Sequence, residues 1–508
     1  MKNLVQLITY VDRLADGGIA ELSGLLKGPL QGLFAGVHLL PFYYPIDGAD
    51  AGFDPVDHTL VDPRLGNWQD IKALSEDVEL VADLIVNHIS SASLQFQDYR
   101  AQGADSVWAG LFLTRDKVFP GGATDADLQA IYRPRPGLPF CEAELDSKEA
   151  VQLWTTFTPA QIDIDVTHPL GQEYLDNILR AFAANSVRMI RLDAVGYTIK
   201  LPGTSCFMLP ETFAYIAQLS SRVHKLGMEV LVEIHSHYKK QIEIAQQVDW
   251  VYDFALPPLL LHAFSFRTAE PLERWLRIRP VNALTVLDTH DGIGIIDIGA
   301  DGAEPGLVPP EELDQLVENI HRNSNNQSRL ATGASASNLD LYQVNCTFYD
   351  ALARDDLKYL LARALQLFVP GIPQIYYVGL LAGENDMCLL ERTGVGRDIN
   401  RHYYTQQEVT DAMQRPVVRS LCALIELRNT HRAFQGSFSI GESATEQILL
   451  RWDCDTDFAE LMINFLDGNY HLRISAEGGR RDVDLLAFQR TDSQIKADIP
   501  CIEDSTAP

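Results

Sequence analysis

Short runs of apolar and β-branched residues recur along most of the chain, and stretches with helical spacing separate several of them. The runs predict eight strands, at residues 5–10, 35–42, 79–88, 188–195, 229–236, 249–256, 283–290 and 372–378. Apolar positions three and four residues apart predict helices at 173–185, 210–226, 239–247 and 355–369. Strands that alternate with helices are typical of an α/β fold with parallel strands, and eight of them predict a (β/α)8 TIM barrel.

Two of the connections are too long for simple crossovers and predict inserted loop domains after the third and the seventh strand. The first insertion, residues 89–167, is rich in proline and glycine, and the second spans 292–354. The barrel itself is then expected at 1–88, 168–291 and 355–434. The remaining segment, 435–508, contains only strand-like runs (QILLRWD, DFAELMINF, NYHLRIS and VDLLAF) and predicts a C-terminal antiparallel β-domain.

The composition places the chain among ordinary globular proteins and limits its partners. Of its 508 residues 46% are hydrophobic and 22% charged, and the formal net charge is −28. This charge disfavours nucleic acid and anionic membrane surfaces, because both attract basic proteins, and no apolar run approaches the roughly 20 residues of a membrane span. Seven cysteines stand singly, and the N-terminal segment lacks the apolar core of a signal peptide. We therefore expect a cytoplasmic protein with reduced thiols.

Ionisable side chains gather at the carboxyl ends of four predicted strands, where barrel enzymes carry their catalytic groups. A single such residue is more often a helix cap or a loop anchor. Four strands that bring acids, imidazoles and a guanidinium to one rim favour a catalytic site instead, because unused buried charges destabilise a fold. In chain order these residues are Asp83, Asn87 and His88, then Arg191, Asp193 and Tyr197, then Glu233, His235 and His237, and last His290 and Asp291.

Carboxylates on consecutive strands suit the cleavage of a glycosidic bond with retention of configuration. That reaction uses a nucleophilic carboxylate and a protonated carboxyl group about 5–5.5 Å apart, close to the roughly 4.8 Å between neighbouring strands. Asp193 is the candidate nucleophile, held ionised by Arg191 two residues earlier. Glu233 is the candidate acid and base, with a pKa raised by burial and negative neighbours. Asp291 is left to stabilise the transition state.

A metal site is the alternative for the segment LVEIHSHYKK, because Glu233, His235 and His237 alternate along a strand and point to one side. Two imidazoles and a carboxylate make a plausible zinc set, which His88 or His290 would have to complete. The acids and the guanidinium on the other strands favour a glycosidase, which needs them. On that interpretation His237 has a supporting or merely structural role.

Four short segments resemble characteristic regions of the α-amylase superfamily of glycosidases, in the same order: DLIVNH, RLDAVGY, VEIH and VLDTHD. Met189 and Val286 stand where many members have Gly and Phe, at positions that are not catalytic in the family. Within the superfamily, longer segments resemble the sucrose phosphorylases, at residues 48–66, 131–140, 253–263, 289–299, 336–345 and 396–404. The resemblance covers nearly the whole chain and is weakest at its C-terminal end.

The resemblance implies a double displacement on sucrose. Asp193 would attack the anomeric carbon while Glu233 protonates the departing fructose, and inorganic phosphate would then release α-D-glucose 1-phosphate. It implies that the glucosyl unit is held by Asp50, Phe53, His88, Phe157, Arg191, His290, Asp291 and Arg397. It implies that the acceptor side is formed by Tyr132, Arg135, Tyr197, His235, Asp340, Leu341, Tyr342 and Gln343.

By the same resemblance the enzyme would need no cofactor and no metal, and phosphate would be a co-substrate, although Asn87 is similar to a calcium ligand of some α-amylases. The loops carrying Arg135 and residues 340–343 would shift between a fructose-accepting and a phosphate-accepting arrangement. The chain would act as a monomer or a homodimer, with transglucosylation as a side activity.

Three other functions stay open. One is a related phosphorylase, acting on sucrose 6'-phosphate or on a glucosylglycerol-type substrate, which would have the same carboxylates and a different acceptor pocket. Another is a sucrose hydrolase or transglucosylase, which would release glucose as fast without phosphate as with it. The last is a non-catalytic barrel that serves as a binding or scaffold protein, which the presence of all three carboxylates disfavours.

Overall fold

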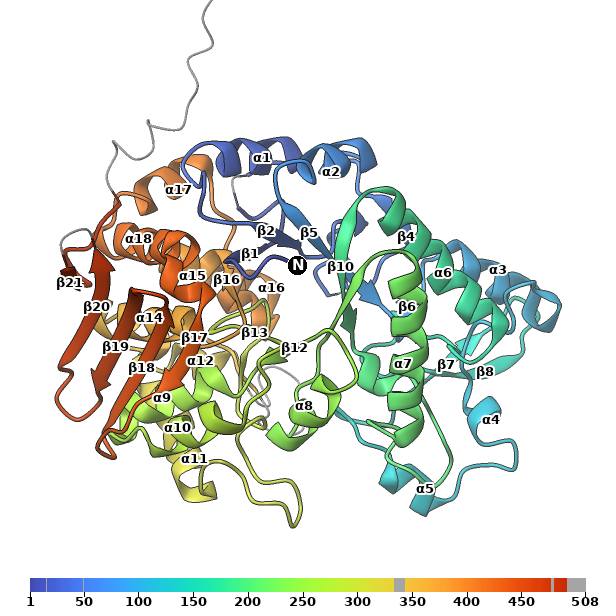
Figure 1. The fold of residues 1–508 in the computed structure, drawn as a ribbon. Coiled ribbons are helices and arrows are strands. Elements are labelled where there is room, and N and C mark those ends of the chain that lie inside the picture. The colour runs from blue at the N-terminus through green and yellow to red at the C-terminus, as the bar shows by residue number, and fades with distance from the viewer. Residues whose placement is uncertain (15, 49, 333–342, 477–478, 491–508) are drawn as a thin grey trace, which may run out of the picture.

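Eight parallel strands close into a barrel at the centre of the molecule (Figure 1). The computed structural model describes residues 1–14, 16–48, 50–332, 343–476 and 479–490. Each barrel strand pairs with the barrel strand that follows it, and the last closes against the first. They are β1 (Gln6–Thr9), β2 (Gly36–Leu39), β5 (Glu79–Ile85), β10 (Val187–Asp193), β11 (Glu229–Val232), β12 (Trp250–Asp253), β13 (Ala283–Thr285) and β16 (Ile372–Tyr376). All eight lie where the sequence predicts them, so the TIM barrel is confirmed.

The barrel interior changes from apolar to polar toward the carboxyl ends of the strands. Met189 on β10 and Leu231 on β11 belong to an apolar cluster that contains residues of six barrel strands. Side chains two residues apart on a strand point to the same face, so Arg191, Asp193 and Glu233 follow them on the inward side. Leu192 on β10 pairs with Val232 on β11. The register therefore places Asp193 and Glu233 side by side, each one residue beyond this pair.

Helices cover the outside of the barrel (Figure 1). The four that the sequence predicts are α6 (Pro169–Ala184), α7 (Pro210–Lys225), α8 (Tyr238–Ala245) and α14 (Asp356–Phe368). In α6 the His168 side chain caps the first turn, Pro169 follows it, and apolar side chains are buried along one face. The others are α1 (Ile19–Lys27), α2 (Trp68–Leu74), α9 (Leu256–Phe266), α10 (Glu270–Ile278), α13 (Phe348–Ala351), α15 (Tyr377–Leu380), α16 (Met387–Thr393), α17 (Gln406–Ala412) and α18 (Pro416–Thr430). Within the described residues, none of the helices is long and apolar enough to cross a membrane.

Both long connections contain secondary structure of their own. The first forms two antiparallel strand pairs, β6 (His88–Ser90) with β9 (Gln161–Asp163) and β7 (Phe140–Glu144) with β8 (Ala150–Trp154). It also contains α3 (Leu94–Gln102), α4 (Arg115–Val118) and α5 (Asp125–Ala130). The second contains α11 (Pro310–Asn323), α12 (Gln327–Leu330) and the pair β14 (Ile293–Gly294) and β15 (Gln343–Val344). The division of the chain into separate domains stays a prediction.

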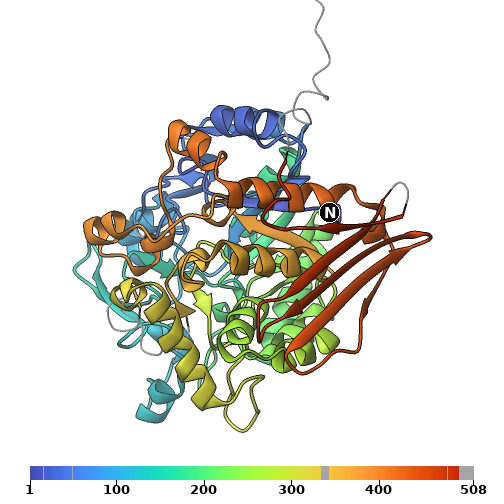
Figure 2. The same ribbon diagram turned by 90° about the vertical axis from the view of Figure 1, so that its left-hand side faces the viewer.

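A five-stranded antiparallel sheet follows the barrel, and Figure 2 shows it at one side of the molecule. Its strands are β17 (Ser437–Ile440), β18 (Gln447–Cys454), β19 (Asp457–Asn464), β20 (Tyr470–Ala476) and β21 (Gly479–Val483). The indole nitrogen of Trp452 on β18 donates to the carbonyl oxygen of Phe368 at the end of α14, at 2.6 Å. This bond fastens the sheet to the barrel.

Two details of the sheet differ from the sequence prediction. The segment VDLLAF is not a strand beyond Val483, because the residues after it form a turn in which Leu485 is buried. The apolar residues of this turn have the same sequence pattern as a strand, which explains the wrong prediction. The sequence analysis also missed β17, whose alternate half-buried and exposed residues form the outer strand of the sheet.

Candidate active site

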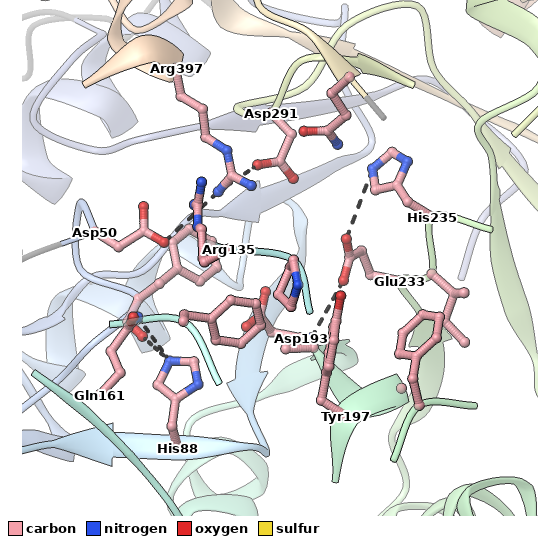
Figure 3. Close-up of a pocket in the computed structure, with 18 of the residues that line it drawn as sticks. Asp50, His88, Arg135, Gln161, Asp193, Tyr197, Glu233, His235, Asp291 and Arg397 are labelled. Atoms are coloured by element: carbon pink, nitrogen blue, oxygen red, sulfur yellow. Dashed lines mark hydrogen bonds and ion pairs between the residues drawn. The ribbon is translucent and has the colours of Figure 1, made fainter. Parts of the chain in front are cut away.

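One pocket lies at the carboxyl ends of the barrel strands (Figure 3). It encloses ≈ 830 Å³, part of which is open to solvent. Most site residues predicted from the sequence line it: Asp50, Phe53, His88, Tyr132, Arg135, Phe157, Asp193, Tyr197, Glu233, His235, His290, Asp291, Gln343 and Arg397. Arg191 does not line it but is buried against two of its carboxylates. Asp340, Leu341 and Tyr342 lie outside the described residues.

Residues far apart in the sequence meet in this pocket. Asp50 and Phe53 lie in the loop between β3 (Tyr43–Tyr44) and β4 (Asp57–Val61). Tyr132, Arg135 and Phe157 come from the first insertion, and Gln343 from the second. The ends of barrel strands thus supply Asp193 and Glu233, and the loops supply Asp50 and most of the aromatic and amide groups.

The sequence analysis missed six residues that line the pocket: Pro134, Gln161, Ala194, Gly196, Phe207 and Ile234. The side-chain amide of Gln161 lies 3.1 Å from Nε2 of His88, because the β6–β9 pairing brings the two residues together. The ring of Phe207 stacks on Tyr132 at 4.5 Å and packs on Tyr197 at 4.7 Å. Gln161 lies in the first insertion and Phe207 lies well beyond the end of β10, so no strand-end signal indicated either residue. Ala194, Gly196 and Ile234 are sequence neighbours of predicted residues and lie within the motifs RLDAVGY and VEIH, so these motifs could have indicated them.

Arg191 joins three carboxylates at the base of the pocket. Its Nη1 lies 2.5 Å from Oδ1 of Asp83 and 2.9 Å from Oδ1 of Asp193, and its Nη2 lies 3.8 Å from Oε1 of Glu233. The guanidinium is 2% exposed, so these contacts act in a poorly screened environment. His38 Nε2 holds the other oxygen of Asp83 at 3.0 Å. Asp83 therefore holds the guanidinium of Arg191 in place, with its charge next to the two candidate catalytic acids, Asp193 and Glu233.

Asp193 differs from the sequence prediction in its ionisation. Burial raises its pKa well above the usual range, and Glu233 raises it further, outweighing the lowering by Arg191. Arg191 therefore only partly offsets the effect of burial on the pKa of Asp193. The two neighbouring carboxyl groups share one cation, the guanidinium of Arg191.

Asp291 lies close to this pair, with a carboxylate oxygen within 4.8 Å of one of Glu233, and it is paired with Arg397 (Figure 3). Burial alone would raise the pKa of Asp291, but Arg397 Nη1, 3.1 Å from its Oδ1, lowers it far below the usual range together with nearby imidazoles. Arg397 also lies 3.8 Å from Asp50 Oδ2, and Arg401 lies 3.8 Å from Asp50 Oδ1. Asp291 is therefore a permanent negative charge facing the cavity.

His88, His290 and Phe53 form a less polar part of the lining. The Phe53 ring stacks on His290 with centroids 4.8 Å apart, and the Phe53 carbonyl lies 2.8 Å from Nε2 of His88. Burial lowers the pKa of both histidines, so each is a neutral imidazole near pH 7. Neutral imidazoles beside an aromatic face suit the hydroxyls and the C–H surface of a sugar.

The two histidines after Glu233 have different environments. Nδ1 of His235 lies 3.0 Å from Oδ2 of Asp297, and its Nε2 lies 3.9 Å from Oε1 of Glu233. Burial lowers the pKa of His235, but Asp297 and the other acids outweigh it, and the net shift is upward. His237 instead caps α8 by accepting from the Lys239 backbone amide and contacts the Pro305 carbonyl at 3.1 Å. The structural role expected for His237 is confirmed.

The segment that suggested a zinc site does not assemble the predicted ligands. His237 caps α8 instead, and within the part of the chain that the structure describes, the group whose ligand atoms lie within 4.8 Å of one another is Glu233, His235 and Asp291. Arg397 is already paired with Asp291 and Arg191 contacts Glu233, so a dication would meet two guanidinium groups. These charges fit acid–base chemistry better than a metal site.

A lysine ammonium occupies the position next to Asn87. Lys200 Nζ lies 2.8 Å from Oδ1 of Asn87 and 2.5 Å from Oδ2 of Asp163, and its side chain is 2% exposed. The same carboxylate accepts the backbone amide and the hydroxyl of Thr156. The ammonium of Lys200 therefore supplies these oxygens with the positive charge that a bound metal cation would otherwise bring.

The chain is similar to known proteins over nearly its whole length. Residues 30–243 match the family model described as "Alpha amylase, catalytic domain". A sucrose phosphorylase from Agrobacterium vitis is 60% identical over 92% of this chain and 96% of its own, and one from Bifidobacterium adolescentis is 54% identical over 91% and 92%. The crystal structure of sucrose 6F-phosphate phosphorylase from Thermoanaerobacter thermosaccharolyticum superimposes with a TM-score of 0.88 at 36% identity, covering 95% of this chain and 97% of its own.

Proposed function

Because the chain belongs to the α-amylase family and, within it, to the sucrose phosphorylases, we propose that it catalyses the reversible phosphorolysis of sucrose. The products are α-D-glucose 1-phosphate and D-fructose, and the configuration at the anomeric carbon is retained. The observation that carries this proposal within the structure is the placement of Asp193 and Glu233 at the ends of adjacent strands, bridged by Arg191. Two carboxyl groups at neighbouring-strand spacing suit a retaining double displacement.

In the first step a carboxylate oxygen of Asp193 attacks the anomeric carbon of the glucosyl unit. The bond from that carbon to the bridging oxygen breaks, and Glu233 gives its proton to the oxygen, so fructose leaves. We assign the proton of the pair to Glu233 in the reactive complex. Arg191 favours this assignment, because its Nη1 is 2.9 Å from Asp193 while its Nη2 is 3.8 Å from Glu233.

In the second step an oxygen of inorganic phosphate attacks the same carbon from the side that fructose has left. Glu233, now ionised, takes a proton from phosphate, the bond to Asp193 breaks, and glucose 1-phosphate is released. Positive charge develops on the sugar ring in both transition states. The permanently ionised Asp291, held by Arg397, stabilises that charge.

The binding residues divide into two groups around these acids. Asp50, His88, His290 and Arg397, with the rings of Phe53 and Phe157, hold the glucosyl unit. Tyr132, Arg135, Tyr197, His235 and Gln343, together with Asp340, Leu341 and Tyr342, form the acceptor side that takes fructose or phosphate. In Figure 3 His235 and Tyr197 lie on the other side of Asp193 from Arg397 and Asp50, and Arg135 is drawn beside Arg397 and Asp50.

Phosphate is a co-substrate in this reaction, and no cofactor takes part. Sucrose, fructose and glucose 1-phosphate are small soluble molecules, so we place the reaction in the cytoplasm, with the enzyme acting as a monomer or a homodimer. Sucrose is preferred to sucrose 6'-phosphate as the substrate. The support for this choice is the 60% and 54% identity to sucrose phosphorylases against 36% to the sucrose 6F-phosphate enzyme.

The test is to incubate the purified protein with sucrose, with and without phosphate, after chelation by EDTA. We expect glucose 1-phosphate and fructose in equal amounts when phosphate is present, and only slow release of glucose when it is absent. Glucose formed equally fast without phosphate would identify a hydrolase. Loss of turnover after chelation would identify a metal enzyme, and a faster reaction with sucrose 6'-phosphate would move the assignment to that substrate.

A further inference from the structure

Asp297 is a fully buried carboxylate that contacts the candidate acceptor residue His235 from outside the pocket. Its Oδ2 lies 3.0 Å from Nδ1 of His235, and its side chain is 0% exposed. It follows β14, in the second insertion, and none of the strand-end motifs includes it. His235 turns its other nitrogen, Nε2, toward Glu233, which lies 3.9 Å away.

The orientation of this pair is fixed by its surroundings. Oδ1 of Asp297 accepts the backbone amide of Ser236 at 3.2 Å and the side-chain amide of Gln241 at 2.8 Å. The ring of Phe254 stacks on His235 with centroids 3.8 Å apart. A Cβ at Gly294 would come within 2.1 Å of Oδ2 of Asp297 and 3.1 Å of Nδ1 of His235, so the absence of a side chain there leaves room for the pair.

The ionised carboxylate dictates where the protons of the imidazole lie. A carboxylate only accepts hydrogen bonds, so Nδ1 of His235 must carry a proton. Nε2 is then a bare acceptor if the ring is neutral and a donor only if the ring is charged. A carboxylate behind an imidazole favours the charged form, and Glu233 and Asp291, the other acids that face His235, act in the same direction.

We propose that Asp297 is a positioning residue that keeps a proton on each nitrogen of His235, and that the resulting cation makes the acceptor side favour phosphate over water. This inference rests on the proposed phosphorolysis. Phosphate is an anion that enters a protein of net charge −28 and approaches Glu233 and Asp291, so it needs a charged donor close to the attacking position. Water and the sucrose hydroxyls do not depend on that charge.

The variant Asp297→Asn separates charge from orientation. The Asn oxygen can still accept from Ser236 and Gln241, while its amide faces Nδ1 of His235. Nδ1 then becomes an acceptor, and the neutral ring carries its proton on Nε2, so a donor still points into the pocket. We expect the KM for phosphate to rise about tenfold, as the loss of a charge-assisted hydrogen bond predicts. The KM for sucrose and the slow hydrolysis without phosphate should stay within about twofold.

A matched control removes a buried carboxylate that is equally enclosed but lies elsewhere. Asp253 is 1% exposed and is paired with Nε of Arg279 at 2.6 Å, and it does not line the pocket. We expect Asp253→Asn to lower the melting temperature without changing the ratio of phosphorolysis to hydrolysis. A change of that ratio in both variants would mean that general loosening, and not the charge of Asp297, controls phosphate use, and would overturn the inference.

His235→Gln provides a second variant, which keeps a donor of similar length without the charge. It should raise the KM for phosphate as Asp297→Asn does, and the double variant should be no worse than either. If Asp297→Asn does not fold, His235→Gln alone carries the test. An unchanged KM for phosphate in these variants, or a parallel loss of hydrolysis and phosphorolysis in Asp297→Asn, would overturn the role of Asp297 while leaving sucrose phosphorolysis intact. A wild-type protein that forms no glucose 1-phosphate would instead reject the proposed function.

Discussion

The Nη1 atom of Arg191 lies 2.9 Å from Oδ1 of Asp193, and both residues belong to the same short strand. The same nitrogen is held at 2.5 Å by Asp83 from the neighbouring strand β5. The guanidinium thus cannot follow Asp193 if that side chain moves. A nucleophile that must reach one carbon atom gains from such a fixed partner, because the reacting oxygen is already placed before the substrate arrives.

Replacing the candidate nucleophile tests this arrangement directly. We expect Asp193→Asn to fold normally and to lose sucrose turnover by a factor on the order of 10⁴ or more, because no carboxylate remains to form the glucosyl ester. Circular dichroism checks the fold, and assays of fructose release check the activity. Turnover close to that of the wild type would remove Asp193 from the mechanism.

The buried ammonium of Lys200 should contribute strongly to stability. We expect Lys200→Met to lower the free energy of unfolding by about 3–5 kcal/mol, because Asp163 would be left buried without its countercharge. The exposed pair of Lys27 and Asp77, at 2.9 Å with side chains 60% and 37% exposed, offers a control. Lys27→Met should change the stability by less than about 1 kcal/mol. Equal melting temperatures for the two variants would contradict the role given to Lys200.

Glycine 379 is expected to tolerate no side chain. A Cβ there would lie 2.0 Å from Nη2 of Arg363 and 2.0 Å from Oδ2 of Asp288, which form a buried ion pair at 2.6 Å. Gly379→Ala should therefore destabilise the protein by about 3 kcal/mol or more.

Gly24 in helix α1 is the matched site, since nothing lies within 4 Å of a Cβ there. Gly24→Ala should stabilise the protein by about 0.5–1 kcal/mol. Thermal melting of the two variants gives the comparison. A Gly379→Ala protein as stable as the wild type would show that the ion pair can move aside.

Low pH should destabilise the folded protein by protonating Asp83, which lies beneath the pocket. Burial would raise its pKa, but Arg191 and then His38 outweigh it, and the pKa falls from 3.8 to about 2. A carboxyl group with a depressed pKa in the folded state adds stability above its unfolded pKa and loses it as the pH falls through the folded value. The contribution, about 2 kcal/mol at neutral pH, should disappear between about pH 4 and pH 2.

Unfolding by urea at a series of pH values measures this loss, with Asp83→Asn as the comparison. The difference in stability between the wild type and this variant should shrink as the pH falls through that window. A difference that stays constant down to pH 2 would mean that Asp83 is not ionised against Arg191.

The strand and helix positions were predictable because they depend on local periodicity. The acids at the strand ends were predictable for a related reason: the two-residue repeat that turns Met189 inward also turns Arg191 and Asp193 inward. Gln161 and Phe207 were not, because Gln161 is placed by the pairing of β6 with β9 and Phe207 by its packing on Tyr132 and Tyr197. The VDLLAF error has the same origin, since burial of Leu485 in a turn is a tertiary contact.

The sequence alone thus determined the barrel, the rim at which Asp193, Glu233 and Asp291 gather, and the family whose chemistry they suit. Only the tertiary structure decided the charge environment and the supporting contacts: the raised pKa of Asp193, the ammonium of Lys200 beside Asn87, the turn of His237 into a helix cap, and Asp297 behind His235. The physical reason is that periodicity specifies which way a side chain points, whereas its ionisation depends on burial and on neighbours that the fold brings from distant parts of the chain.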